Sequence, residues 1–407
     1  MKIEYKNAIY NGEVNDKGEP SGQGKIEYKN GDTYEGQFFD GYRHGKGNYS
    51  FADEAAIYEG EWKNGKRNGY GKYFDGKTLL SYEGQWENSL KHGKGKQEIG
   101  VLTYAEGTWV EGKLVGSGTI NCQLGIFKGE FIDEYRLSTG KIYEYRTNKI
   151  IFEGTLENGR KLKGTYIDLH GTVITGNFKN DEPNGVCKAI YKNGNIYEGE
   201  YVDGYISGEG KMIYTNGDMY EGQWLTHSYF YDEAKSGFGK MTYADGTIYE
   251  GNWKNNIPNG GGKKFFKNGD IYDGNWNDGK KSGQGTYTWK NGDFYQGNWE
   301  NDDITGYGKR LYDNGTYEGF FKNNKKHGYG KIAYFDGKIY EGEWKDGLRH
   351  GKGKTTFSDG VTAEGNYDKD KGNGEFIFTN PDKSKSVKLY SDGKFVKNIT
   401  EEEDKLK

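Results

Sequence analysis

The chain has 407 residues, with 68 glycines, 4 prolines and a formal net charge of −4. Its 36 tyrosines, 20 phenylalanines and 9 tryptophans argue against a disordered chain, and the low proline content excludes collagen and proline-rich linkers. The slightly acidic balance disfavours nucleic acid as a partner, because chains that bind nucleic acid usually carry a basic excess.

The N-terminal stretch MKIEYKNAIYNG has no apolar segment of the kind found in signal peptides, and no part of the chain approaches about 18 consecutive apolar residues. Cys122 and Cys187 show neither metal-ligand spacing nor a disulfide framework, which is typical of a reducing compartment. We therefore expect a cytoplasmic protein that neither enters the secretory route nor spans a membrane.

A Tyr-x-Gly unit recurs along the chain at spacings of 22–24 residues. There are two exceptions: only weaker copies lie between Tyr82 and Tyr197, and Tyr220 and Tyr249 are 29 residues apart. Such self-similarity indicates a repeat protein of about sixteen units that fill the chain and leave no room for a separate domain. The clear copies begin at Tyr10, Tyr34, Tyr58, Tyr82, Tyr197, Tyr220, Tyr249, Tyr272, Tyr295, Tyr317 and Tyr340, and the weaker ones lie at Val110, Phe127, Phe152, Ile174 and Ala363.

Each unit has two halves of strand length. The first reads Tyr-x-Gly-x-aromatic, as in Tyr295, Gly297 and Trp299, and the second begins Gly-x-Gly, as in Gly283 and Gly285. Glycines and aromatic residues share one parity, so they lie on one face of a sheet, where each ring covers a glycine of a neighbouring strand. Three glycines cost about 2–3 kcal/mol, and three buried aromatic residues contribute about 1.5–3 kcal/mol each.

The connections indicate an antiparallel meander. Asn-Gly and Asp-Gly dipeptides, such as Asn291-Gly292, predict tight hairpins from one unit to the next. Within a unit we expect longer loops, such as Lys63–Asn68 and Lys322–His327. The predicted fold is all-β: an elongated, single-layer antiparallel β-meander solenoid of about sixteen β-hairpin repeats, forming a twisted rod or half-pipe. About 32 strands at about 4.8 Å each give a length of order 150 Å.

The segment YEGEWKDGLRHGKGKTTFSDG, which begins at Tyr340, strongly resembles the MORN (membrane occupation and recognition nexus) repeat. The resemblance covers nearly the whole chain, although Lys113–Lys179 departs from the pattern. It implies an elongated, twisted single-layer sheet. Arrays of this kind occur in junctional membrane tethers, phosphoinositide kinases, a SET-domain methyltransferase, ciliary radial-spoke heads and protist cytoskeletal scaffolds. A chain made of repeats alone is most similar to the last two.

We divide the chain into four segments. Residues 1–112 are regular N-terminal repeats, and residues 113–180 are degenerate repeats that form either a bend or a redundant middle. Residues 181–397 are regular C-terminal repeats with a closing strand, and residues 398–407 form a charged tail.

The sequence shows no arrangement typical of an enzyme. Gly71–Thr78 fits the phosphate-loop pattern G-x-x-x-x-G-K-[ST], but the next residues read as a strand, and the repeat accounts for both glycines. Four histidines share one position of the repeat, where we expect exposed loops: His44, His92, His327 and His350. Histidines of adjacent repeats would lie too far apart to bind one zinc ion. We predict no catalytic, cofactor-binding or metal-binding residues.

Two surface features are candidates for binding. Tyr229, Phe230 and Tyr231 lie together in an insertion, where they either fold back onto the sheet or anchor a partner. We expect the loops within the repeats to align basic residues along one edge of the sheet. This edge is either simply solvated, or it binds anionic lipid head groups, or it binds an acidic protein. The candidate basic strip consists of Arg43, Lys66, Arg67, Lys91, Lys325, Lys326 and Arg349.

The expected function is that of a non-enzymatic scaffold or protein-interaction module in a ciliary, radial-spoke-like or cytoskeletal setting. Its partners would be other proteins of a larger assembly, and self-association is a further alternative. Two competing functions are a phosphoinositide-binding membrane tether and a regulatory subunit of a separate enzyme.

Overall fold

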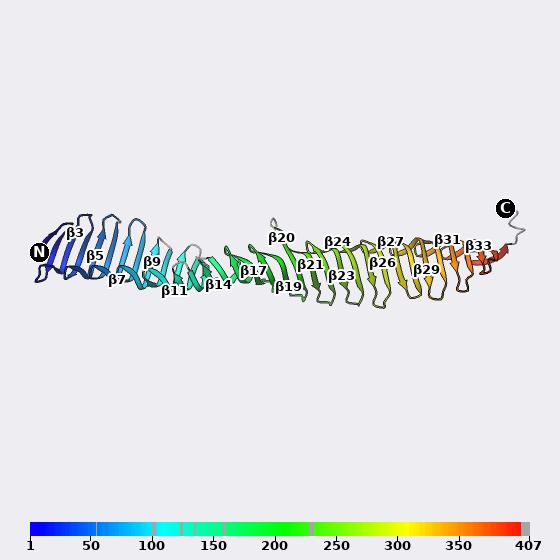
Figure 1. The fold of residues 1–407 in the computed structure, drawn as a ribbon, viewed down its shortest axis with the longest axis horizontal. Coiled ribbons are helices and arrows are strands. Elements are labelled where there is room, and N and C mark those ends of the chain that lie inside the picture. Colours follow the sequence, from blue (N-terminus) through cyan, green and yellow to red (C-terminus); the bar gives the residue numbers. More distant parts are fainter. Residues whose placement is uncertain are drawn as a thin grey trace. The chain divides into compact units, whose positions relative to one another are not determined.

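The computed structural model describes residues 1–53, 55–99, 103–122, 125–133, 136–157, 160–227 and 232–399. Over these residues the regular secondary structure consists of strands joined by turns, without a helix (Figure 1). The chain forms two compact units, the first made of Met1–Gly194 and Glu200–Gly204, the second of Asn195–Gly199 and Tyr205–Lys407. The division falls within strand β18 (Ile196–Val202).

The strands follow from the alternation of apolar and polar residues. In β26 (Phe294–Glu300), Tyr295, Gly297 and Trp299 are buried, while Gln296 and Glu300 are exposed. A period of two places the first set on one face of the sheet and the second set on the other. The prediction of an all-β fold with rings and glycines on a common face is therefore confirmed. We call the face with the Tyr-x-Gly rings the ring face and the opposite one the charged face.

In the first unit, consecutive strands from β1 to β17 pair antiparallel in one layer. These strands are β1 (Lys2–Tyr5), β2 (Ala8–Val14), β3 (Pro20–Tyr28), β4 (Thr33–Phe39), β5 (Tyr42–Phe51), β6 (Ala56–Lys63), β7 (Lys66–Asp75), β8 (Leu80–Glu87), β9 (Leu90–Ile99), β10 (Thr103–Val110), β11 (Lys113–Cys122), β12 (Gly125–Asp133), β13 (Arg136–Tyr143), β14 (Ile150–Glu157), β15 (Arg160–Ile167), β16 (Val173–Lys179) and β17 (Glu182–Ile190).

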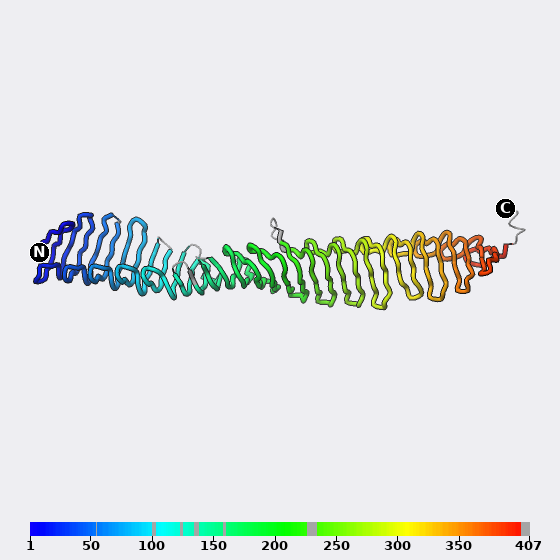
Figure 2. The backbone as a smooth tube through the Cα atoms, viewed as in Figure 1, coloured from blue at the N-terminus to red at the C-terminus, as the bar shows by residue number. Residues whose placement is uncertain are grey.

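In the second unit, strands β19 to β35 form a meander of the same kind, and Figure 2 shows its backbone running back and forth between short turns. These strands are β19 (Tyr205–Ile213), β20 (Met219–His227), β21 (Asp232–Thr242), β22 (Ile248–Lys254), β23 (Ile257–Phe265), β24 (Ile271–Asn277), β25 (Lys280–Thr288), β26 (Phe294–Glu300), β27 (Asp303–Tyr312), β28 (Gly315–Lys322), β29 (Lys325–Tyr334), β30 (Ile339–Lys345), β31 (Leu348–Thr356), β32 (Thr362–Asp368), β33 (Lys371–Thr379), β34 (Lys385–Ser391) and β35 (Lys394–Ile399).

From β2 to β16 and from β19 to β32, one glycine of each strand lies directly opposite one glycine of the next, so the glycines form a column across each sheet. In the first unit the column runs from Gly12 to Gly176, which lies opposite Cys187. In the second unit it runs from Gly210 to Gly365, which lies opposite Phe376. The column gives the rings the space in which they lie.

The core is a ladder of aromatic rings packed over this column. The ring of Tyr272 packs edge-on against Trp276 of its own strand and Trp299 of the next repeat, with centroid distances of 5.1 and 5.3 Å. The Tyr272 hydroxyl donates a hydrogen bond to the carbonyl of Asn275, and Nε1 of Trp276 donates one to the carbonyl of Gly262. Burial therefore leaves no polar atom of these two rings without a partner.

The turns differ from the expectation. The connections within a repeat, predicted as longer loops over Lys63–Asn68 and Lys322–His327, are two-residue turns. At Asn64 and Gly65 both φ angles are positive, 51° and 78°, as a type I′ turn requires. The prediction was wrong because a β-bulge after each turn absorbs the extra residues: the register between β6 and β7 shifts between Gly60 and Trp62.

The Asn-Gly and Asp-Gly edge carries the longer connection. Between β3 and β4, the amide of Gly31 donates to the carbonyl of Tyr28, and the amide of Tyr28 donates to the carbonyl of Asp32. Gly31 has a φ of 89°, so the dipeptide does mark a turn, but one of four connecting residues. The Asp32 carboxylate accepts hydrogen bonds from the Tyr49 hydroxyl and the Ala52 amide, which ties this turn to the next one.

Candidate interaction surfaces

Acidic and basic residues alternate from strand to strand on the charged face. Glu59 of β6 lies opposite Lys72 of β7, which in turn lies opposite Glu83 of β8 at 3.1 Å between Nζ and Oε1. The second unit repeats the arrangement, with 2.9 Å between Lys211 Nζ and Glu221 Oε1. Such cross-strand pairs contribute about 0.2–1 kcal/mol each. They also leave neighbouring charges balanced along this face.

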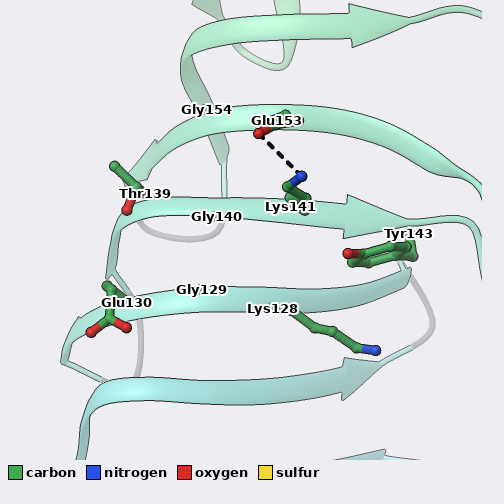
Figure 3. A pocket seen from close by; sticks show the side chains of 9 residues that line it. All are labelled: Lys128, Gly129, Glu130, Thr139, Gly140, Lys141, Tyr143, Glu153 and Gly154. Carbon is green, nitrogen blue, oxygen red and sulfur yellow. Dashed lines mark ion pairs between the residues drawn. The ribbon is translucent and has the colours of Figure 1, made fainter.

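An open hollow of about 500 Å³ lies on the charged face of the first unit, and Figure 3 shows the side chains that line it. Glycines of three consecutive strands form its floor, Lys141 and Glu153 are paired at 3.2 Å across it, and Lys128 Nζ lies 5.0 Å from the ring centroid of Tyr143. Two lysines and two glutamates line the hollow, so its charges balance. The lining residues are Lys128, Gly129, Glu130, Thr139, Gly140, Lys141, Tyr143, Glu153 and Gly154.

Three aromatic residues lie on the charged face of the second unit, on consecutive strands β27, β28 and β29. Tyr307, Phe320 and Tyr329 are 50%, 49% and 56% exposed. Tyr307 lies directly opposite Phe320, with the two rings edge-on at 5.5 Å between centroids. The hydroxyl groups of Tyr307 and Tyr329 donate to Glu318 and Glu341 of the following strands. These rings are surplus to the core, so they offer apolar surface to a partner.

Most cations of the predicted basic strip lie over aromatic rings on the ring face. The guanidinium carbon of Arg43 lies 4.4 Å from the ring centroid of Trp62, and that of Arg67 lies 4.3 Å from Trp86. Arg43 also donates to the carbonyl of Gly65. Cation–π contacts of this kind contribute about 0.5–2 kcal/mol. The same arrangement holds for Lys91 over Trp109, Lys326 over Trp344 and Arg349 over Tyr367.

Lys66 and Lys325, the other two residues of the strip, are exposed. Each begins a strand directly after a two-residue turn and lies opposite another lysine, Lys63 or Lys322. Each also precedes a cation of the ring face, so the period of two directs it to the charged face. The structure therefore distributes the predicted strip over both faces of the sheet.

Burial changes the ionisation of several of these groups. Desolvation lowers the pKa of the Lys326 amine to about 8, although Asp370 acts in the opposite direction. Desolvation likewise lowers the pKa of Lys281, and it raises the pKa of the ring-face phenols such as Tyr272. The first role of these cations is therefore to pack against the rings of the chain, and binding a ligand would be secondary.

The last regular repeat differs from the others on the ring face. Ala363 stands where other units carry the tyrosine of Tyr-x-Gly, and Gly372 stands where Arg349 stands in the repeat before. Phe376 occupies the glycine column, and its ring covers Gly365. A hollow of about 450 Å³ opens beside these residues, and its lining includes Phe378.

Two further predicted features are the aromatic insertion and the four histidines of the repeat. Tyr229, Phe230 and Tyr231 lie outside the described residues. The expectation of exposed loop histidines was wrong: His44, His92, His327 and His350 are half-buried and lie within strands, because the preceding turns are short.

No three His, Cys, Asp or Glu side chains are grouped to hold a metal ion in the described part of the chain. Among the same residues, no helix is long and apolar enough to cross a membrane. Gly71, which belongs to the phosphate-loop pattern, lies in β7 under the ring of Tyr58.

Parity could have revealed both groups that the sequence analysis missed. The residue between the two glycines of Gly-x-Gly must face away from the rings, and in Tyr307 and Tyr329 it is aromatic. The same parity, extended to two residues before the first glycine, places Lys326 on the ring face. The obstacle was the predicted loop, which removed that position from the strand.

Strands that stack a glycine column under a ladder of rings, one hairpin for each repeat, define a solenoid-like β-repeat protein. A model of the MORN repeat matches thirteen segments that together cover more than half of the chain. The chain belongs to the MORN-repeat family, whose repeats indicate a structural or interaction module. The matched segments are residues 10–33, 34–55, 58–77, 82–98, 106–122, 175–196, 197–219, 232–248, 249–271, 272–294, 295–316, 317–339 and 340–362.

No curated protein matches the chain in sequence. Similar solved structures include the TCP10 domain of Danio rerio CPAP, at 14% identity over 54% of this chain and 96% of that one, with a TM-score of 0.25. The TCP10c domain of Drosophila melanogaster Sas-4 has 14% identity over 56% and 98% of the two chains and a TM-score of 0.17. With TM-scores this low, neither likeness carries an argument about fold or function.

Proposed function

We propose that this chain is a non-enzymatic scaffold that binds other proteins along its sheets, in a ciliary, radial-spoke-like or cytoskeletal setting within the cytoplasm. The observation that carries the proposal is the aromatic cluster Tyr307, Phe320 and Tyr329. Its rings are about half exposed on the charged face, while the buried rings of the core lie on the ring face. Apolar surface that the fold does not need is typical of a protein-binding site.

The charges favour a protein partner over a membrane. An anionic membrane is attracted by clustered, solvent-facing cations, at about 1 kcal/mol for each residue. Here Arg43 and Arg67 lie over rings and donate to the carbonyls of the next turn. On the charged face, lysines such as Lys72 lie opposite carboxylates. The phosphoinositide-binding tether and the regulatory subunit of a separate enzyme remain the competing functions.

A photo-crosslinking experiment tests the proposal. A photoreactive phenylalanine analogue at position 329 should crosslink a specific protein in cells that naturally contain this chain, and the matched position 250, on the same face but five strands before the cluster, should not. Position 250 is an exposed glutamate of β22. Equal labelling at both positions, or none at 329, would contradict the proposal.

Liposome sedimentation tests the competing function. Vesicles that contain about 5% phosphatidylinositol bisphosphate should not retain the chain at 150 mM salt, because surface attraction is screened over about 8 Å there. Retention that falls steeply as salt increases would favour the membrane tether instead.

A further inference from the structure

In several repeats, a cation of the chain fills a cage of aromatic rings, whereas Pro258 and Ile304 take the same position in others. Arg349 follows a two-residue turn by two positions and lies over Tyr340 and Tyr367, with 5.5 and 4.8 Å from the guanidinium carbon to the ring centroids. Its guanidinium also donates to the carbonyl of Asp370, the second residue of the next turn. Arg43 and Arg67 make the same two kinds of contact, with Gly65 and Ser89 as the carbonyl acceptors. The template is therefore a guanidinium, rings and one turn carbonyl.

The next repeat has the rings but lacks the arginine at the equivalent position of its own strand. Gly372 lies opposite Tyr367 in the register in which Arg349 lies opposite Trp344. Rings are still present around this position: Phe376 lies 5.2 Å from Tyr367 and 5.3 Å from Tyr390 between centroids, and Phe378 lies 6.4 Å from Tyr390. The space that an arginine side chain takes elsewhere is the hollow of about 450 Å³.

The polar part of the template is present as well. Gly393, the second residue of the turn between β34 and β35, lines the hollow at the place where Asp370 stands in the preceding repeat. The amide of Gly393 donates to the carbonyl of Gly372, as the amide of Asp370 donates to that of Arg349. The backbone around the hollow thus repeats the geometry that binds a guanidinium elsewhere in the chain.

The charges around the hollow are mixed. The carboxylates of Asp370 and Asp392 line it, each paired with a cation of this chain, at 3.1 Å to Arg349 Nε and 2.7 Å to Lys371 Nζ. Two further lysines are near: Lys394 lines the hollow, and Lys388 Nζ lies 4.3 Å from the ring centroid of Phe378. A visiting cation must therefore rely on the rings and the turn carbonyl, and its own flanking residues are expected to be acidic or neutral.

We propose that this hollow binds an arginine side chain of a partner protein, which takes the place that Arg43, Arg67 and Arg349 fill in their own repeats. The inference rests on the proposed function as an interaction module and specifies one contact of the partner. An arginine suits the site better than a lysine, because the planar guanidinium stacks on rings and donates to the turn carbonyl at the same time.

The test uses the full chain with 13C-labelled alanine methyl groups and two tripeptides as probes. Acetyl-Gly-Arg-Gly-amide should shift the methyl signal of Ala363, which lines the hollow, with a dissociation constant of order 1–10 mM, as expected for one cation in a small site. The matched probe carries citrulline, which has the shape of arginine without its charge, and should bind about fivefold more weakly or less. The signal of Ala189, in the other unit, should not shift.

Two variants complete the test. Gly372→Arg supplies the missing cation from the chain itself and should weaken tripeptide binding at least tenfold. A Cβ on Gly372 would lie 3.0 Å from Cε2 of Phe376, so the ring must move by a few tenths of an ångström. If Gly372→Arg does not fold, Phe378→Leu serves instead, because it removes one ring of the cage and keeps apolar volume; it should weaken binding about fivefold.

Equal shifts with arginine and citrulline, no shift of Ala363 at 50 mM probe, or unchanged binding by the folded variants would each overturn the inference. If the chain crosslinks a partner at position 329 but does not bind the arginine probe, this contact is refuted and the proposed function is not. A chain that binds the probe but crosslinks no protein would refute the proposed function alone.

Discussion

A side chain at Gly285 would collide with the ring of Tyr272, because a Cβ on Gly285 would lie 2.6 Å from Cζ of that ring. Tyr272 belongs to β24 and Gly285 to β25, so the contact joins two strands across the glycine column. Position 285 must be a glycine because the ring of Tyr272 approaches it so closely. The ring can be buried there because position 285 has no side chain. Each of the two residues thus explains the other.

This contact predicts that Gly285→Val destabilises the second unit by about 2–4 kcal/mol, since the ring must leave its site or the strands must separate. Gln284→Val is the matched control: Gln284 is exposed on the charged face, and its side-chain amide donates only to Asn298, so the loss should stay within about 1 kcal/mol. Urea unfolding followed by tryptophan fluorescence measures both. Equal shifts of the two midpoints would refute the role assigned to the column.

The carboxylate of Asp370 connects a turn to the preceding repeat. Its Oδ1 accepts hydrogen bonds from the backbone amide of Arg349 at 2.9 Å and from Nε of the same residue at 3.1 Å. Asp370→Ala should lower the free energy of unfolding by about 1–3 kcal/mol, because two donors lose an acceptor. Asp370→Asn keeps one acceptor oxygen and should lose less. Thermal unfolding by circular dichroism would detect the order; an alanine variant as stable as the wild type would contradict it.

The two-residue turns predict a position effect that the sequence analysis did not expect. Asn323 has a φ of 49°, a conformation that β-branched residues avoid, so Asn323→Val should cost about 1–2 kcal/mol. Lys325→Val, at the exposed start of β29, is a control that should change stability by no more than about 0.5 kcal/mol. If both variants unfold at the same urea concentration, the turn is not conformationally demanding and the long-loop expectation gains support.

Parity made most of this fold predictable. Tyr295, Gly297 and Trp299 alternate with polar residues in a way that allows only one strand orientation, and the recurrence of the unit fixes consecutive pairing. The turns at the two edges of the sheet were harder to predict. Asn-Gly signals mark turns but do not give their length, and the bulge of β7 between Arg67 and Gly71 takes up residues that look like a loop in sequence.

The candidate binding sites were harder to predict, for a related reason. Charged residues near turns usually extend into solvent, whereas the guanidinium of Arg43 lies over three aromatic rings because its strand starts earlier than expected. To predict the aromatic cluster around Phe320, one must know the cross-strand register, because Phe320 lies beside the bulge of β29. A sequence gives the parity of a residue within its strand, but its neighbours across the sheet depend on turns and bulges.

The ionisation of Lys326 gives a prediction with a definite sign. Its amine lies 4.1 Å from the ring centroid of Trp344, and burial lowers its pKa to about 8 in the folded chain. In the unfolded chain the pKa of a lysine is about 10.4. Between these two values the unfolded state binds more protons than the folded state, so this residue makes the stability rise with pH in that window. Below about pH 8 both states hold the proton, and the cost of burying the charge is constant.

Two variants isolate the effect of Lys326. Lys326→Met keeps the length of the side chain and removes the titrating group, whereas Lys326→Arg keeps a charge that does not titrate. The difference in free energy of unfolding between the wild type and either variant should therefore grow in favour of the wild type by about 1–3 kcal/mol from pH 7.5 to pH 10. The buried phenols, whose pKa values are raised, are common to all three chains and cancel in the difference. Urea unfolding at four pH values measures it, and a difference that stays flat or falls would show that Trp344 and its neighbours hold Lys326 in its charged form.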